Sequence, residues 1–286
     1  MNLATKSLSV NFHLWEPCNM RCIFCFATFQ DVKKSVLPKG HLSEEEALEV
    51  INLLADYGFG KITFVGGEPT LCPWLRTLNY QARQQTLTTM LVTNGSTILT
   101  GKLDYTHEFD WVALSVDSLS DRTNLQNGRA ITGKSPICKR DYDKIIDLLH
   151  RNDTRIKINT VVTQTNFQED FHEFIEFARP ERWKVFQVLP VAGQNDECIT
   201  DYLINQEEFN HFIHKHQDIP QMVKESNDDM SGSYLMIDPA GRFFDNTTGT
   251  YKYSKSILEI GVEDALTQIA FDIEKFQKRG GSYQWN

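Results

Sequence analysis

Short apolar runs alternate with amphipathic segments along the first two thirds of the chain. The runs have strand length, and we expect strands at 9–14, 61–65, 87–93, 111–116, 155–162 and 183–189. Helical periodicity follows them; for example, a capping box at 43–46 precedes apolar positions that share one helical face. Six strand-then-helix units predict an α/β fold with a parallel sheet, curved into a partial (β/α)6 TIM-like barrel.

The last third of the chain has a more irregular pattern. We expect residues 1–190 to form the barrel, and residues 191–286 to form a C-terminal extension that packs with it as one unit and closes the active site. No run of about 18 apolar residues is present, so we expect no membrane span. The net charge of −9 argues against direct nucleic-acid binding through a basic surface.

Four polar motifs stand where predicted strands end. They are the cysteine-rich segment after the first strand and residues 66–69, 93–96 and 115–118. In barrels of this kind, the carboxyl ends of the strands and the loops that follow them form the active-site face. The motif positions therefore predict an enzyme with its site at this end of the barrel.

The cysteine-rich segment reads Cys-Asn-Met-Arg-Cys-Ile-Phe-Cys and contains Cys18, Cys22 and Cys25. Three thiolates within eight residues can hold one small metal–sulfur core, but they do not complete a closed four-thiolate site. If the core is a [4Fe–4S] cluster, one iron keeps a free position for a small-molecule ligand. The alternative is a zinc site with a distant fourth ligand, such as Cys72, Cys138 or a histidine. A disulfide is less consistent with a chain that has no secretory signal, for which we expect a cytoplasmic location.

The CxxxCxxC order resembles the radical S-adenosylmethionine (SAM) superfamily. The resemblance implies a [4Fe–4S] cluster on the three cysteines, with SAM chelating the open iron. Residues Gly66-Gly67-Glu68-Pro69 match the GGEP motif of these enzymes, although alone they also fit a tight turn before a helix. Glycines at this point would let the backbone approach a ligand closely. The resemblance implies SAM contacts for Gly66, Gly67, Glu68, Asn94, Ser115 and Arg129.

Basic residues alternate with apolar ones in three of the predicted strands. Lys61 begins one strand, Lys157 and Asn159 share a face of another, and Arg182 and Lys184 share a face of a third. Buried cations without partners are costly, so inward-facing cations need an anion, and lysine and arginine suit phosphates. The alternative is that these residues lie at strand ends with their charged groups in water.

Longer segments resemble the viperin family of antiviral radical SAM enzymes. They include Lys61-Ile-Thr-Phe-Val-Gly-Gly-Glu-Pro, Arg182-Trp-Lys-Val-Phe-Gln and the tail Lys278-Arg-Gly-Gly-Ser-Tyr-Gln-Trp, and the similarity spans nearly the whole chain. The resemblance implies dehydration of a ribonucleoside triphosphate to its 3′-deoxy-3′,4′-didehydro form, an RNA chain terminator in antiviral (antiphage) defence. CTP, UTP and GTP all remain open as the substrate.

The resemblance also implies a role for individual residues. A triphosphate would lie on four strand cations, with an asparagine near the sugar, another near the base, a tyrosine near the reacting ribose and the tail folded over the nucleotide. The four strand cations are Lys61, Lys157, Arg182 and Lys184. Asn159 is the asparagine near the sugar and Asn11 the one near the base. Tyr234 is the tyrosine near the reacting ribose, and Lys278 and Arg279 are the tail residues. Tyr234 and Lys184 are the candidates for catalysis, because a proton must reach the departing hydroxyl.

Two other points follow from the resemblance. An electron donor such as a flavodoxin or ferredoxin is expected. Animal viperins carry an N-terminal amphipathic helix that attaches them to membranes, whereas this chain begins almost at the barrel, so we expect a prokaryotic homologue without membrane attachment. The alternatives are a radical SAM enzyme that acts on another small phosphorylated metabolite and a non-catalytic metal- or nucleotide-binding regulator.

Overall fold

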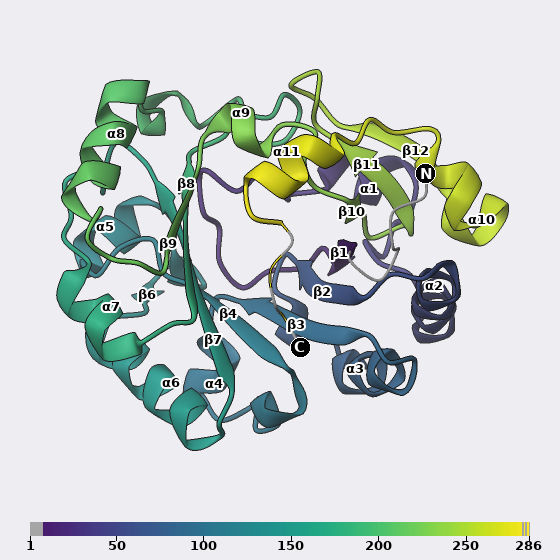
Figure 1. The fold of residues 1–286 in the computed structure, drawn as a ribbon, viewed down its shortest axis with the longest axis horizontal. Coiled ribbons are helices and arrows are strands. Elements are labelled where there is room, and N and C mark those ends of the chain that lie inside the picture. The colour runs from purple at the N-terminus through teal and green to yellow at the C-terminus, as the bar shows by residue number, and fades with distance from the viewer. Residues whose placement is uncertain (1–7, 282, 284, 286) are drawn as a thin grey trace.

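The computed structural model describes residues 8–281 together with residues 283 and 285. Within this part of the chain, one sheet has the strand order β12-β11-β10-β1-β2-β3-β4-β7-β8-β9 (Figure 1). Its six central strands are parallel: β1 Ser9–Trp15, β2 Lys61–Gly66, β3 Thr88–Thr93, β4 Trp111–Ser115, β7 Arg155–Val162 and β8 Arg182–Gln187. The partial TIM-like barrel predicted from the sequence is therefore confirmed, with strand ends within about two residues of those expected.

Helices follow the parallel strands and lie outside the curved sheet (Figure 1). They are α2 Glu44–Tyr57, α3 Leu75–Gln84, α4 Ser96–Leu99, α5 Asp121–Gln126, α6 Lys139–Arg151, α7 His172–Ala178 and α8 Gln206–Lys215. The predicted capping box is present: the Ser43 hydroxyl accepts the Glu46 backbone N–H, and the Glu46 carboxylate accepts that of Ser43. This reciprocal pairing satisfies backbone donors that have no partner within the helix.

The C-terminal third adds strands to both edges of the barrel sheet. Strand β9 Met222–Glu225 pairs with β8, whereas β10 Met236–Ile237 pairs with β1 and is followed by the antiparallel strands β11 Arg242–Asp245 and β12 Lys252–Ser256. The sequence pattern did not predict these short strands. Helices α9 Asn227–Met230, α10 Ile257–Leu266 and α11 Ile273–Lys278 complete the segment. A division at residue 190 remains a prediction.

Along the parallel strands, apolar residues that pack against the helices alternate with residues that face the inside of the curved sheet. On the helix side, Ile62, Phe64 and Leu91 are fully buried, as are their neighbours on β4 and β7. Burying each such side chain contributes about 1.5–3 kcal/mol. The positions between them, such as Lys61 and Thr63, face inward and carry the polar groups. Among the described residues, no helix has the length and apolar character that crossing a membrane would need.

Candidate active site

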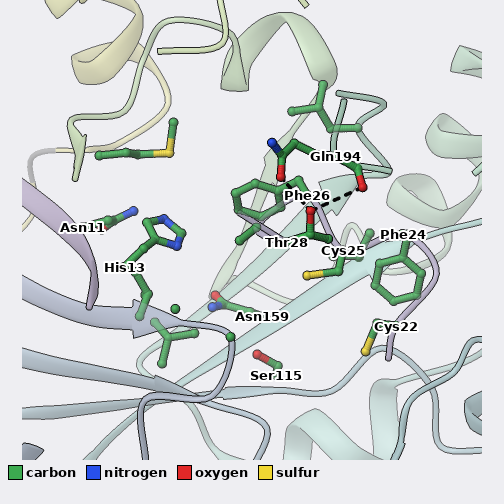
Figure 2. A pocket seen from close by; sticks show the side chains of 18 of the residues that line it. Asn11, His13, Cys22, Phe24, Cys25, Phe26, Thr28, Ser115, Asn159 and Gln194 are labelled. Carbon is green, nitrogen blue, oxygen red and sulfur yellow. Dashed lines mark hydrogen bonds between the residues drawn. The ribbon is translucent and has the colours of Figure 1, made fainter. Parts of the chain in front are cut away.

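A cavity of about 1220 Å³ occupies the inside of the curved sheet (Figure 2). It collects most residues that the sequence analysis selected: Asn11, Cys18, Cys22, Cys25, Lys61, Gly66, Gly67, Asn94, Ser115, Arg129, Lys157, Asn159, Lys184, Tyr234 and Arg279. Three selected residues, Glu68, Arg182 and Lys278, do not line it. The three cysteines follow the carboxyl end of β1, while Lys61 and Lys157 lie nearer the amino ends of their strands. The cavity therefore has a thiol end and a cationic end.

The two glycines at the end of β2, Gly66 and Gly67, are required by the protein backbone itself. A Cβ on Gly67 would lie 2.1 Å from the Glu16 carbonyl oxygen, and one on Gly66 would lie 2.3 Å from that of Trp15. The Gly67 N–H also donates to the Trp15 carbonyl at 2.6 Å. The backbone that approaches these glycines closely is therefore the segment that leads into the cysteines. The sequence alone did not reveal this reason for glycine at these two positions. The glycines fix where the cysteine loop begins.

Arg129 is held against the cysteine loop by a buried ion pair. Its guanidinium lies 2.6 Å from the Asp117 carboxylate, donates to the Ser115 carbonyl, and approaches the Cys22 sulfur at 3.8 Å. Burial alone would lower the pKa of Arg129, but Asp117 raises it, so the arginine stays charged. Burial raises the pKa of the Cys22 thiol to about 12 and that of Cys18 to about 11. Sequence analysis selected Arg129 and Ser115 but gave no role to Asp117, the residue that orients the arginine.

Glu68 positions a neighbouring loop instead of facing the cavity. Its buried carboxylate accepts hydrogen bonds from the Thr70 and Thr93 hydroxyls and from the Asn94 backbone N–H. Asn94 does line the cavity, and its amide donates to Asn19 in the cysteine segment at 2.9 Å. The GGEP motif therefore ties together the loops that follow β1, β2 and β3.

The strand cations lie inside the barrel. Lys61 is 2% exposed, Lys157 9% and Lys184 3%, so the alternative of charged groups in water is wrong for these lysines. Lys157 has no hydrogen-bond or ion-pair partner among the residues that the structure describes. Burial, and then the neighbouring Arg182, lowers its pKa to about 7. Burial and the other cations also lower the pKa of Lys61, whose ammonium donates to the Tyr283 hydroxyl.

Glu225, at the end of β9, is the carboxylate of this cationic end. It is fully buried and contacts the Lys184 ammonium and the Tyr234 hydroxyl, with Arg279 at 3.5 Å. Lys184 also donates to Tyr234 at 2.9 Å. Burial acts to raise the pKa of Glu225, but Lys184 and Arg279 hold it below its usual value. Sequence analysis gave no role to Glu225.

The C-terminal tail contributes one of its two predicted cations. Arg279 stacks over the Tyr234 ring at 3.6 Å and donates to the Ser233 carbonyl, whereas Lys278 is exposed and lies outside the cavity. Arg182 lies behind the tail, where it donates to the Gly280 carbonyl at 2.6 Å. Within the described residues, this end of the cavity therefore gathers the cations Lys61, Lys157, Arg182, Lys184 and Arg279 around one carboxylate, Glu225.

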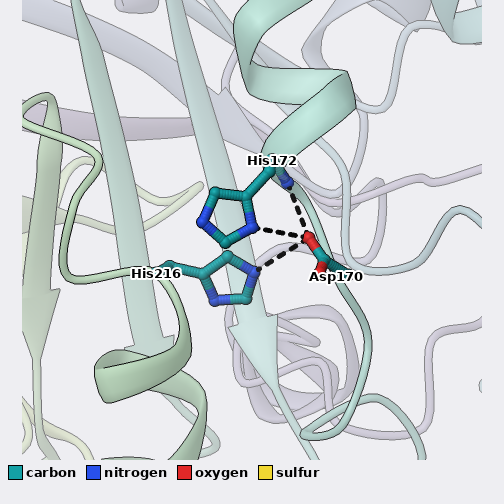
Figure 3. Close-up of side chains that lie close together, drawn as sticks. All are labelled: Asp170, His172 and His216. Carbon is teal, nitrogen blue, oxygen red and sulfur yellow. Dashed lines mark hydrogen bonds and ion pairs between the residues drawn. The ribbon is translucent and has the colours of Figure 1, made fainter.

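A second polar cluster lies outside the barrel, between α7 and α8 (Figure 3). His172 bridges two carboxylates, with Nδ1 2.7 Å from Asp170 and Nε2 2.9 Å from Asp218. Beside it, both ring nitrogens of His216 bond to the backbone, one to a carbonyl of α8 and one to the N–H of Phe171. Asp170, His172 and His216 lie close enough to resemble a metal site. Because the nitrogens of His216 are already engaged, we interpret the cluster as a structural tie.

Comparison with known proteins identifies the class. Residues 15–178 match the radical SAM superfamily. Similar solved structures include anSMEcpe with bound AdoMet (TM-score 0.69, 15% identity, 95% of this chain and 82% of that one). Another is SuiB of Streptococcus suis bound to S-adenosylmethionine (TM-score 0.66, 15% identity, 96% of this chain and 68% of that one). At that identity these structures support the fold alone. The chain is a member of the radical SAM superfamily.

More similar relatives define the family. An S-adenosylmethionine-dependent nucleotide dehydratase of Flammeovirga pacifica is 51% identical over 97% of this chain and 96% of that protein. One of Lacinutrix mariniflava is 53% identical over the whole chain, which spans only 60% of that protein. The nucleotide dehydratase RSAD2 of Oncorhynchus mykiss is 37% identical over 99% of this chain and 82% of that protein. The chain belongs to the S-adenosylmethionine-dependent nucleotide dehydratases, the viperin family that its motifs resemble.

Proposed function

We propose that this protein dehydrates a ribonucleoside triphosphate, CTP, UTP or GTP, in a SAM-dependent radical reaction. The observation that carries the proposal is the cavity, which has three cysteines at one end and is lined at the other by Lys61, Lys157, Lys184 and Arg279. Among the described residues, one carboxylate, Glu225, contacts two of these cations, Lys184 and Arg279. A ligand that carries several negative charges fits the second end, because it would balance buried cations that lack counter-charges. The names of the relatives, all S-adenosylmethionine-dependent nucleotide dehydratases, support the same reaction.

The thiol end fits a [4Fe–4S] cluster with one open iron. Cys18, Cys22 and Cys25 line the cavity. Of the alternative fourth ligands of a zinc site, Cys72 and Cys138 do not line it, whereas the histidine His13 does, as does Cys198. Three soft thiolate donors leave one position for SAM. Bound there, the cluster and SAM would supply the radical chemistry that removes a hydrogen atom from the nucleotide. Gly66, Gly67, Asn94, Ser115 and Arg129 line this part of the wall and are the proposed SAM contacts.

The cationic end would bind the triphosphate and supply the proton that the departing 3′-hydroxyl needs. Lys61, Lys157 and Lys184 line the cavity. Asn159 stands two residues after Lys157 on β7, closer to the carboxyl end of the strand and so to the cysteine end of the cavity. The Lys184 ammonium and the Tyr234 hydroxyl both donate to the Glu225 carboxylate. Because burial raises the pKa of Tyr234, its hydroxyl stays protonated. We propose that this group supplies the proton that leaves with the 3′-hydroxyl as water. The product would be the 3′-deoxy-3′,4′-didehydro nucleotide, an RNA chain terminator in antiviral (antiphage) defence.

Two further parts of the proposal rest on the resemblance and on general sequence arguments. Two electrons for each turnover, one to cleave SAM and one to reduce the nucleotide radical after water leaves, would come from a donor of the flavodoxin or ferredoxin class. A cytoplasmic location follows the expectation for a thiolate-held cluster in a reducing compartment. Both remain predictions.

Anaerobic reconstitution tests the proposed function. The protein is loaded with iron and sulfide, reduced, and given SAM with each ribonucleoside triphosphate in turn, and mass spectrometry follows 5′-deoxyadenosine and any nucleotide lighter by one water. We expect one triphosphate to stimulate 5′-deoxyadenosine formation and to lose water. Cys22→Ala should lose iron and all SAM cleavage, whereas Lys184→Ala should keep iron and weaken nucleotide binding. One zinc in place of about four irons, or 5′-deoxyadenosine without a dehydrated nucleotide, would overturn the proposal.

A further inference from the structure

His13 is a buried histidine with two unused ring nitrogens. It is 3% exposed and lines the cavity, yet neither Nδ1 nor Nε2 has a hydrogen-bond partner among the described residues. A neutral imidazole carries one N–H donor and one acceptor, and burying both without partners costs free energy. The same protein satisfies both nitrogens of His216, its other fully enclosed histidine. The free nitrogens of His13 therefore point to a partner that binds in the cavity.

The surroundings of His13 fix the ring and keep it neutral. Phe26, Phe29 and Phe244 meet it edge-on, with ring centroids 5.0–6.1 Å away. Burial lowers the pKa of His13 to about 3, so the ring is uncharged at neutral pH. A neutral ring does not suit a phosphate, which the lysines already serve. It suits a neutral group that both donates and accepts, such as a sugar hydroxyl or the edge of a base.

The strand register places His13 between the two ends of the cavity. On β1, His13 pairs with Val65 of β2, the residue before the Gly66-Gly67 turn, while Lys61 lies four residues earlier on the same strand. At about 3.3 Å per residue, His13 lies about 13 Å from the level of Lys61. Asn11 and His13 both line the cavity from β1, with Asn159 across from them (Figure 2). A nucleotide with its phosphates on the lysines would present its nucleoside at this level.

We infer that His13 recognises the nucleoside part of the substrate through a neutral hydrogen bond, and so selects the nucleoside without contributing to phosphate binding. This inference rests on the proposed function. It separates two tasks along the cavity, with charge attraction at the lysines and neutral hydrogen bonding at His13. It also explains why an imidazole, which an apolar cage would otherwise exclude, stands among three phenylalanines.

The test replaces His13 with phenylalanine in the reconstituted enzyme. Phenylalanine fills the same cage but removes both nitrogens, and His13→Gln keeps a donor and an acceptor. Calorimetry measures the Kd of inorganic tripolyphosphate and of each ribonucleoside triphosphate, and 5′-deoxyadenosine formation measures turnover. Analogues without the 2′- or 3′-hydroxyl distinguish a sugar contact from a base contact. His41→Phe is the matched control, because His41 stacks on Trp15 outside the cavity lining.

We expect His13→Phe to bind tripolyphosphate within twofold of wild type and the preferred triphosphate about tenfold more weakly, the loss of one hydrogen bond. His13→Gln should recover part of that loss, and His41→Phe should match wild type. Wild-type affinity of His13→Phe for every nucleotide would overturn the inference, as would an equal loss for tripolyphosphate, which would make His13 a packing residue. Should His13→Phe not fold, His13→Gln and His13→Leu give the same comparison. If no triphosphate stimulates wild type, the proposed function itself fails.

Discussion

Replacing Glu225 with glutamine should destabilise the protein and yet strengthen its binding of polyphosphate. Glu225 is fully buried and is the carboxylate against which Lys184 and Arg279 are balanced. Glutamine has nearly the same shape and still accepts one hydrogen bond, but it carries no charge. The variant therefore leaves two buried cations without a counter-charge while changing the packing very little.

The size of the effect follows from the burial of all the partners. Lys184 and Arg279 have side chains only 4% and 5% exposed, so water does not screen them. Removing one member of a buried ion pair costs about 3–5 kcal/mol. Because glutamine keeps a hydrogen bond, we expect the lower end, about 3 kcal/mol. For a chain of this size that loss lowers the melting temperature by about 6–12 °C.

Tripolyphosphate should reverse most of this loss. In wild type, Glu225 competes with a bound anion for Lys184 and Arg279; in the variant, the anion is the counter-charge. We therefore expect Glu225→Gln to bind tripolyphosphate more tightly than wild type and to gain more in melting temperature from it. Turnover should fall, because the hydrogen-bonded link between Lys184 and Tyr234 through Glu225 is broken.

Thermal and urea unfolding, each with and without tripolyphosphate, measure these quantities. Glu181→Gln is the control: Glu181 pairs with Arg155 at the surface, with side chains 44% and 31% exposed, and should lose less than about 1 kcal/mol. A variant with an unfolding free energy within 1 kcal/mol of wild type, or with weaker binding of tripolyphosphate, would refute the reasoning.

Three further predictions test separate parts of the site. The pKa of Lys157 is about 7, and a bound anion favours the charged form of this lysine. Tripolyphosphate binding should therefore strengthen about tenfold from pH 8 to pH 6, beyond any change in the control Lys157→Arg, which stays charged. Equal pH profiles of wild type and Lys157→Arg would contradict this. Gly67→Ala should load little iron although all cysteines remain, because its Cβ would overlap the Glu16 carbonyl, and normal iron content would contradict it. Asp218 and then Asp170 raise the pKa of His172, so the stability it contributes should be present below its unfolded pKa of about 6.5 and lost as the pH rises through the higher folded value. The urea midpoints of wild type and His172→Asn should therefore differ at pH 6 and converge at pH 9.

The barrel was predictable because its signal is local. Each parallel strand is a short apolar run, and the polar motif that follows it marks the carboxyl end. The strand ranges 61–65 and 155–162 therefore agree with β2 and β7 to within a residue. Strands β9 and β10 were missed because they are only four and two residues long and are set by pairing with barrel edges distant in sequence. Such pairing leaves little periodicity in the segment itself.

The candidate site was predictable to the extent that alternation and motifs place residues on one face. Lys157 and Asn159 both line the cavity, as two positions of one strand should. Glu68 and Arg182 were also selected as binding residues; in the structure Glu68 ties loops together and Arg182 donates to the tail, and their ligand contacts remain predictions. No local pattern distinguishes a residue that touches a ligand from one that holds its neighbour, because the difference lies in contacts between distant segments.

Two carboxylates that sequence analysis missed share one property: each is a partner of a residue that it found. Asp117 orients Arg129, and Glu225 balances Lys184. Burial of a cation requires compensation, and the compensating carboxylate comes from whichever strand end lies nearest in the fold. At the cationic end, Glu225 balances some of this charge, and Lys157 remains without a partner in the described chain. That remaining positive charge is the physical reason to expect a polyanion there, and it supports the proposed triphosphate site more strongly than any single motif does.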